Sequence, residues 1–162
     1  MTPAPESKTG MLRHALATLA YRGGKSLREA PPEFATFRLD PASRTPGEIV
    51  THMGDLLDWA LTLADGRQLW HDSTPRPWEE EMSRFFAALE ALDRRIASGE
   101  PLDCPAERLF QGPIADALTH VGQMAMLRRV AGAPMKGENY YLADISAGRV
   151  GPDQAKARRE FD

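Results

Sequence analysis

Residues 116–129 read Asp-Ala-Leu-Thr-His-Val-Gly-Gln-Met-Ala-Met-Leu-Arg-Arg, a sequence typical of a helix with one polar seam. The stretch contains no proline, and its apolar residues recur at three- and four-residue steps, which is the period of an α-helix. In such a helix Asp116 and His120 stack on one face about 5–6 Å apart at Cβ, and Gln123 shares their sector. Pro113 is expected to open this helix. The seam therefore faces either solvent or something that it binds inside the protein.

A second helix is predicted to begin at Pro46. Thr45 suits the N-cap, Pro46 the first helical position and Glu48 the position that completes a capping box. The pattern indicates one buried apolar stripe and an opposite polar face that includes Asp55. His52 lies at the margin of the stripe, where an imidazole can lean into the core and keep one edge near solvent.

The first helix is expected to start near Thr9, with leucines and alanines on one apolar face. Gly23-Gly24 costs that helix about 1 kcal/mol per glycine relative to alanine, so the pair is expected to kink or end it. Pro31-Pro32 then stops any continuation, because proline removes a backbone N–H and clashes with the preceding turn.

The third helix is predicted from Pro77 to about Ser98, with Ser73 or Thr74 as its cap. Its apolar residues step by four and three in a sustained heptad seam, which is typical of a helix that packs on other helices. The seam consists of Trp78, Met82, Phe85, Leu89, Leu92 and Ile96. These side chains are therefore assigned to the core and not to a cofactor site.

Together the four helices predict an all-α protein, a four-helix bundle with an extended C-terminal segment. The chain has 162 residues, of which 42% are hydrophobic and 27% charged, as in an ordinary globular domain. One domain is expected over residues 1–162, with a core at about 9–150 and loose termini. Residues 133–162 show little periodicity and are expected to wrap the bundle, with a frayed or helical tail from residue 154.

Charge and composition limit the classes of molecule that the protein is expected to bind. The formal net charge is −3, which gives no general attraction to nucleic acid or to an anionic membrane. No apolar run is long enough to span a bilayer, and the N-terminus lacks the apolar core of a signal peptide. The one cysteine, Cys104, allows no intrachain disulfide and fits a reducing cytoplasm. We therefore expect a cytoplasmic protein that binds neither nucleic acid nor a membrane.

Three side chains offer metal-ligand chemistry: His52 on the second helix, and Asp116 with His120 on the fourth. A pair at i and i+4, completed by one residue from a facing helix, is a common way to build a metal site in a bundle. Two imidazoles and one carboxylate suit Zn²⁺ or Ni²⁺, with Fe²⁺ and Mn²⁺ as alternatives, and leave a position open to water or substrate. The spacing also fits a solvated polar seam without a metal.

Most of the chain resembles the DinB-like superfamily of bacterial four-helix proteins. The resemblance rests on Arg-Thr-Pro-Gly-Glu-Ile-Val-Thr-His-Met-Gly-Asp-Leu-Leu at 44–57 and on the stretch at 116–129. That family typically binds a divalent metal through three histidines, one from the second helix and two from a His-x-x-x-His motif on the last bundle helix. His52 and His120 match two of these positions, whereas Asp116 replaces the remaining histidine.

The resemblance implies a divalent-metal-dependent enzyme, either a thiol-dependent S-transferase or a hydrolase acting on small electrophilic substrates. It also implies a low-molecular-weight thiol and a homodimer. Gln123 or Asp55 would then accept a hydrogen bond from a histidine ligand, and Tyr140 would border the pocket. Arg128 and Arg129 are interpreted as exposed charges, with the anchoring of an anionic thiol as the alternative. A non-catalytic helical module that binds a small molecule or no ligand is the competing hypothesis.

Overall fold

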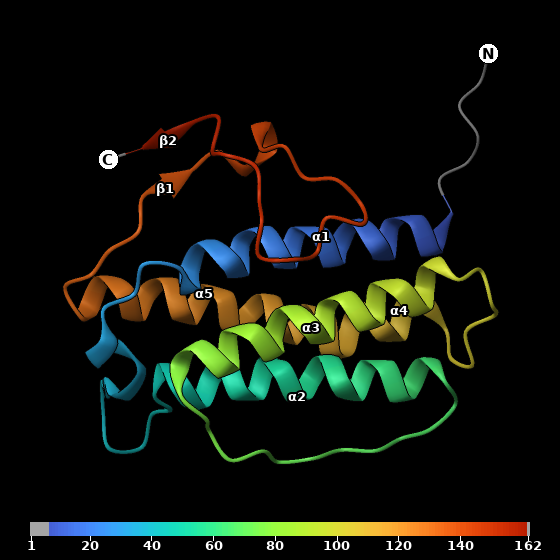
Figure 1. Cartoon of the computed structure of the whole chain (residues 1–162), viewed down its shortest axis with the longest axis horizontal. Helices are drawn as coiled ribbons and strands as arrows, with labels where there is room; N and C mark the ends of the chain where they lie inside the picture. The colour runs from blue at the N-terminus through green and yellow to red at the C-terminus, as the bar shows by residue number, and fades with distance from the viewer. Residues whose placement is uncertain (1–6, 162) are drawn as a thin grey trace.

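The computed structural model describes residues 7–161 and confirms the four-helix architecture (Figure 1). The long helices are α1 (Lys8–Leu27), α2 (Pro46–Ala64), α3 (Trp78–Ala97) and α5 (Ala115–Val130). The shorter elements are η1 (Pro32–Thr36), α4 (Ala106–Leu109), η2 (Phe110–Ile114), η3 (Tyr140–Leu142), β1 (Gly137–Glu138) and β2 (Glu160–Phe161). Of the expected loose N-terminal tail, residues 1–6 lie outside the described part of the chain, and Ser7 is the N-cap of α1.

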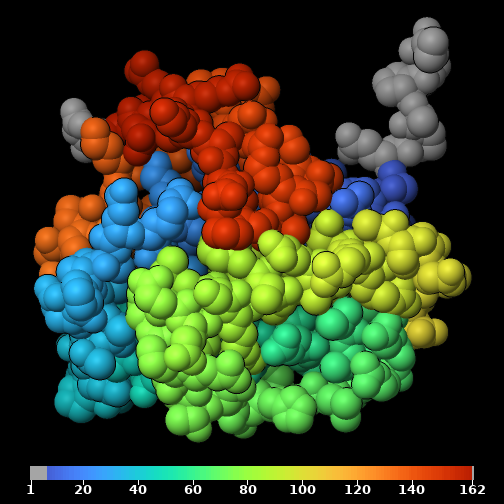
Figure 2. Space-filling view, viewed as in Figure 1, coloured from blue at the N-terminus to red at the C-terminus, as the bar shows by residue number. Residues whose placement is uncertain are grey.

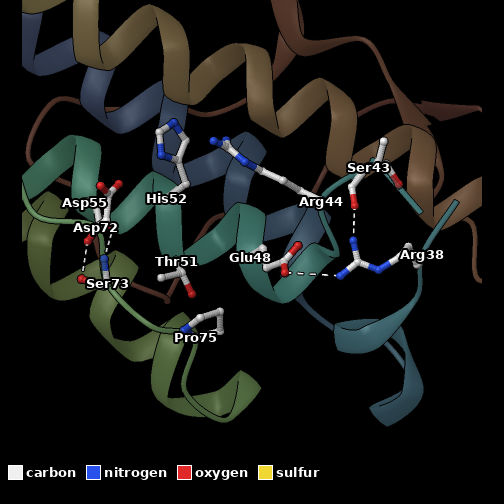
Figure 3. Close-up of a pocket in the computed structure, with 11 residues that line it drawn as sticks. Arg38, Ser43, Arg44, Glu48, Thr51, His52, Asp55, Asp72, Ser73 and Pro75 are labelled. Carbon is white, nitrogen blue, oxygen red and sulfur yellow. Dashed lines mark hydrogen bonds and ion pairs between the residues drawn. The ribbon is translucent and has the colours of Figure 1, made fainter. Parts of the chain in front are cut away.

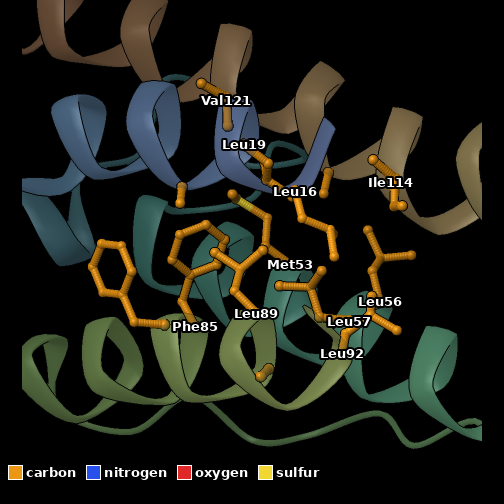
Figure 4. Close-up of a cluster of buried hydrophobic side chains, with 14 of the residues drawn as sticks. Leu16, Leu19, Met53, Leu56, Leu57, Phe85, Leu89, Leu92, Ile114 and Val121 are labelled. Atoms are coloured by element: carbon orange, nitrogen blue, oxygen red, sulfur yellow. The ribbon is translucent and has the colours of Figure 1, made fainter. Parts of the chain in front are cut away.

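The hydrophobic core lies between the four long helices, as Figure 4 shows. The heptad seam predicted for α3 supplies much of it, because Phe85, Leu89 and Leu92 are fully buried. The most extensive contact between two helices is that of α2 with α3. Leucines of α1, Met53 and Leu57 of α2 and Val121 of α5 close the core from the other sides. The apolar stripes predicted from the sequence are thus the faces that the helices bury.

The capping box at the start of α2 is present as predicted. The Thr45 side chain accepts a hydrogen bond from the Glu48 amide at 3.2 Å, and the Glu48 carboxylate accepts one from the Thr45 amide at 2.8 Å. Both bonds satisfy amides that the first turn of a helix leaves without partners. They fix the N-terminus of α2 about two turns before His52.

The glycine pair in α1 does not end the helix, which continues to Leu27. The glycines are instead sites of close packing against α3. A Cβ atom on Gly23 would lie 2.9 Å from the ring of Phe85, and one on Gly24 would lie 3.2 Å from the ring of Phe86. The space that the missing side chains leave is filled by aromatic rings, and this packing outweighs the low helix propensity of glycine.

The last bundle helix begins earlier than Pro113, which was expected to open it. α4, η2 and α5 follow one another without a break, and Pro113 lies inside the π-helical segment η2. Proline has no amide hydrogen and therefore interrupts the i→i−4 hydrogen-bond pattern. A π-helical turn accommodates such an interruption. The expected cap of α3 is also wrong. Pro77 precedes α3 without a side-chain cap, and Ser73 bonds to Asp55 instead.

The C-terminal segment forms a small antiparallel sheet and not the expected frayed or helical tail. β1 pairs with β2, with Gly137 opposite Phe161. The segment crosses α1 in Figure 1 and covers one side of the bundle in Figure 2. Glu138 anchors it there, since its buried carboxylate accepts hydrogen bonds from Tyr21 at 2.5 Å and from Lys25 at 2.7 Å. Within residues 7–161, no helix has the length and apolar character needed to cross a membrane.

Two glycine-to-alanine substitutions should change stability in opposite directions. Gly23→Ala should lower the free energy of unfolding by about 1–3 kcal/mol, because the buried Phe85 ring has no room to move away. Gly122→Ala on the exposed face of α5 meets no atom within 4 Å and should raise it by about 0.5–1 kcal/mol. Urea unfolding measures both values. Stabilisation by Gly23→Ala would contradict the packing argument.

Candidate metal centre

His52, Asp116 and His120 meet where α2 lies beside α5. One carboxylate oxygen of Asp116 lies 3.6 Å from His52 Nε2, and the other lies 3.5 Å from His120 Nε2. The two imidazole rings stand edge to face with their centroids 4.9 Å apart. The three side chains singled out from the sequence therefore lie together, with their ligand atoms all within 4.8 Å of one another.

Local structure explains this convergence. Asp116 and His120 are one turn apart on α5, so the helix itself places their side chains side by side. His52 arrives from α2, whose buried stripe packs against α5 and turns the margin of that stripe toward the α5 seam. The site thus depends on one helix for two of its ligand atoms and on the packing of two helices for the third.

The spacing of the ligand atoms suits a small divalent cation. A tetrahedral ion with bonds of about 2.1 Å to nitrogen and oxygen separates its ligand atoms by about 3.4 Å. One ligand atom from each of the three residues lies within 4.8 Å of the others, and the two shortest N···O distances, 3.6 and 3.5 Å, involve different oxygens of Asp116. They are longer than the roughly 2.7–3.2 Å of a well-formed N–H···O hydrogen bond. The donor set therefore fits a metal ion.

Burial differs among the three residues. His120 is buried, His52 is half-buried, and the Asp116 side chain is 47% exposed. Burial, the nearby positive charge of Arg44 and the neighbouring His120 lower the pKa of His52, and together they outweigh the Asp116 carboxylate, which raises it. A lowered pKa keeps the His52 imidazole neutral near pH 7, which is the form that binds metal ions.

Gln123 holds the His120 ring, as the sequence predicted. Gln123 Oε1 lies 2.9 Å from His120 Nδ1, and both residues are on α5. An amide oxygen only accepts hydrogen bonds, so Nδ1 is the protonated nitrogen in the neutral ring. The lone pair of Nε2 is then directed toward Asp116 and His52. This bond fixes the tautomer and ring orientation that metal binding requires.

Asp55 does not accept the hydrogen bond from a histidine of the triad that the resemblance implied. Its carboxylate accepts hydrogen bonds from the Ser73 amide at 3.0 Å, from the Ser73 hydroxyl at 2.6 Å and from Arg84 of α3. Burial would raise the pKa of Asp55, but the bonds from Ser73 and Arg84 outweigh it and hold the pKa below its ordinary value. Its role is to tie α2 to α3 and to the segment before α3, and it contacts neither histidine.

The expectations for Tyr140 and Arg128 are also wrong. Tyr140 lies against α1, with its ring edge-on to Tyr21 and 4.2 Å from the guanidinium of Arg22, and it does not border the triad. Arg128 is buried and donates hydrogen bonds to the backbone oxygens of Ser26, Arg28 and Ala133. Tertiary packing of the C-terminal segment and of α1 determines both positions, and helix periodicity contains no information about either.

The sequence reasoning missed Trp70 and Arg44. The Trp70 ring stands edge to face with His52 at 5.7 Å and with Trp59 at 5.8 Å. It belongs to the segment between α2 and α3, which Ser73 fixes to Asp55. Because such segments lack periodicity, only the tryptophan itself, a large apolar residue in a polar stretch, could have drawn attention to the position.

A cavity of about 340 Å³ opens beside His52, and Figure 3 shows most of the residues that line it. Its walls come from the loop before α2, the first turns of α2 and the segment before α3. The lining residues are Arg38, Ala42, Ser43, Arg44, Glu48, Thr51, His52, Asp55, Asp72, Ser73 and Pro75. A cavity of this size suits a small molecule and has one of the candidate ligands in its wall.

Comparisons with known proteins give no independent identification. No protein-family model, no curated protein and no solved structure matches this chain. The chain is an all-α protein of four packed helices with a His/Asp/His group that could bind a metal ion.

Nuclear magnetic resonance titration of the histidine rings in metal-free protein should give a pKa for His52 below the ordinary 6.5. Arg44→Gln should raise that pKa, because it removes a positive charge that disfavours the imidazolium. Asp116→Asn should lower it further, because it removes the neighbouring negative charge. The same His52 pKa in Arg44→Gln and in the parent protein would show that Arg44 lies too far away to act on the site.

Proposed function

We propose that His52, Asp116 and His120 bind a divalent cation, and that the protein is a metal-dependent thiol S-transferase of the DinB-like kind. The observation that best supports the proposal is the spacing of three ligand atoms from two helices beside an open cavity. The four-helix bundle supports the kinship, as do the two histidines that match the family pattern. Zn²⁺ and Ni²⁺ suit the mixed imidazole and carboxylate set best.

Each residue has a distinct task in this proposal. His52 and His120 bind through Nε2, and Gln123 holds the His120 ring in the required tautomer. Asp116 contributes negative charge at the exposed side of the site, and Trp70 covers one edge of His52. When bound, the cation would lower the pKa of a thiol in the open position and keep it ionised near neutral pH.

In the proposed reaction the thiol releases its proton to solvent and its sulfur attacks an electrophilic carbon of the substrate. The new carbon–sulfur bond forms as the leaving group departs with its bonding electrons. Asp116 in place of a third histidine makes the site one unit more negative. Such a site withdraws less electron density from the sulfur, so the sulfur keeps more of its nucleophilicity at the cost of a smaller pKa shift.

Metal content tests the first half of the proposal. Protein purified without chelator should contain close to one equivalent of metal by elemental mass spectrometry. His52→Ala and His120→Ala should each abolish this content, whereas His71→Ala removes an exposed imidazole outside the site and should leave it intact. Gln123→Leu keeps all three ligands and should weaken Zn²⁺ affinity by about 10–100-fold.

Substitutions at Asp116 sharpen that test. Asp116→Ala should weaken Zn²⁺ binding, and Asp116→His should bind more tightly than the parent protein because it restores a third imidazole. Equal Zn²⁺ affinity in all three proteins would remove Asp116 from the site. Metal-free protein whose unfolding transition ignores added Zn²⁺ and Ni²⁺ would overturn the proposal and favour a non-catalytic helical module.

Catalysis is tested with cysteine as the thiol and 1-chloro-2,4-dinitrobenzene as the electrophile, because loss of chloride gives a coloured thioether. The rate above the uncatalysed reaction should rise in proportion to metal-loaded protein and disappear in His120→Ala. His71→Ala should retain the parent rate. Metal-loaded protein that gives no rate above the uncatalysed reaction with cysteine or other small thiols would exclude S-transfer and leave the metal site standing.

A further inference from the structure

Arg44 is a cation that the described part of the chain leaves without a hydrogen-bond or ion-pair partner. It immediately precedes Thr45, the N-cap of α2, and its side chain is exposed in the wall of the cavity beside His52. Among residues 7–161 it forms no hydrogen bond and no ion pair. Figure 3 shows its guanidinium extending along α2 toward the His52 ring. The capping box holds the backbone next to Arg44, so the base of this side chain is well fixed.

The other charged groups of the cavity are engaged elsewhere. Arg38 donates hydrogen bonds to the Ser43 carbonyl and to the Glu48 carboxylate. Asp55 forms an ion pair with Arg84, and Asp72 accepts a hydrogen bond from the Trp70 indole at 3.0 Å. In Figure 3 the two aspartates lie on one side of His52 and Arg44 lies on the other. Arg44 is therefore the one charged group of this lining without a hydrogen bond or ion pair to the described residues.

We propose that this cavity binds a small molecule with one carboxylate or phosphate group, which pairs with Arg44 while the reactive end of the molecule reaches the triad. The proposal rests on the proposed function, because it assigns the ligand class of the same site. Its separate basis is geometric: an unpartnered guanidinium and a candidate metal ligand share the wall of one cavity of about 340 Å³. A guanidinium offers paired N–H donors that match the two oxygens of a carboxylate or phosphate.

The test compares an anionic thiol with its neutral counterpart on cobalt-loaded protein. 3-Mercaptopropionate and 3-mercaptopropionamide have nearly the same size, and binding of either is read from sulfur-to-cobalt absorption in the ultraviolet. Arg44→Gln should weaken binding of the anionic thiol by about tenfold, the loss expected for one charge-assisted contact. It should change binding of the neutral thiol by less than about twofold.

Arg129→Gln is the matched control, because it removes the same charge from an exposed position on α5 outside the cavity. It should leave binding of both thiols unchanged. Equal losses for the two thiols in Arg44→Gln, or equal losses of the anionic thiol in both variants, would overturn the Arg44 assignment while leaving the metal site intact. Failure of the parent protein to bind cobalt would instead overturn the proposed function.

A second measurement requires no metal. It therefore separates failure of the Arg44 proposal from failure of the proposed metal-dependent function. Propionate and methyl phosphate are titrated separately into metal-free protein, and the Arg44 side-chain N–H resonances are followed. Saturable shifts with one or both anions support the proposal, and their relative strength tells a carboxylate ligand from a phosphate ligand. Absence of any shift at Arg44 with either anion would overturn the proposal, whatever the metal content of the protein.

Discussion

The half-buried guanidinium of Arg84 holds together the side of the bundle that carries the candidate metal centre. It donates to Asp55 and Asp58 of α2 and to the Thr51 carbonyl, and it lies 3.6 Å from the buried carboxylate of Glu81. Buried carboxylates are strongly destabilising without a counter-ion, so this arginine stabilises the packing of α2 on α3. Through Asp55 and Ser73 the same cluster orders the segment before α3 and brings Trp70 to His52.

The helices could be predicted because local chemistry determines them. The Thr45–Glu48 capping box and the heptad seam of α3 act within one helix, and both are present. The errors come from places where tertiary packing overrides local preference. Gly23 remains helical because the Phe85 ring fills the space beside it, and the C-terminal residues become β2 because β1 and Lys25 are available to bind them.

In the candidate site, too, some features could be predicted from local sequence and others depend on tertiary packing. The pairing of Asp116 with His120, and the bond from Gln123 to His120, follow from helical spacing and were predictable. The approach of His52 depends on how α2 packs on α5, which the apolar stripes indicate only in outline. Tyr140 and Asp55 were misassigned, and Arg44 was overlooked. Their positions follow from loops and inter-helix ion pairs, for which a single sequence contains no periodic signal.

Charge balance connects Asp116 with Arg44. A divalent ion held by three neutral histidines would present two positive charges to a ligand, whereas Asp116 as a ligand would reduce this to one. Arg44 would supply a positive charge again, but at a separate point, in the wall of the cavity that His52 also lines. The total attraction for anions is then similar to that of a three-histidine site, but it is divided between two positions. In the proposed function, such a division would favour a ligand whose ionised sulfur and carboxylate or phosphate are held apart by a short chain, because that ligand would satisfy both charges at once.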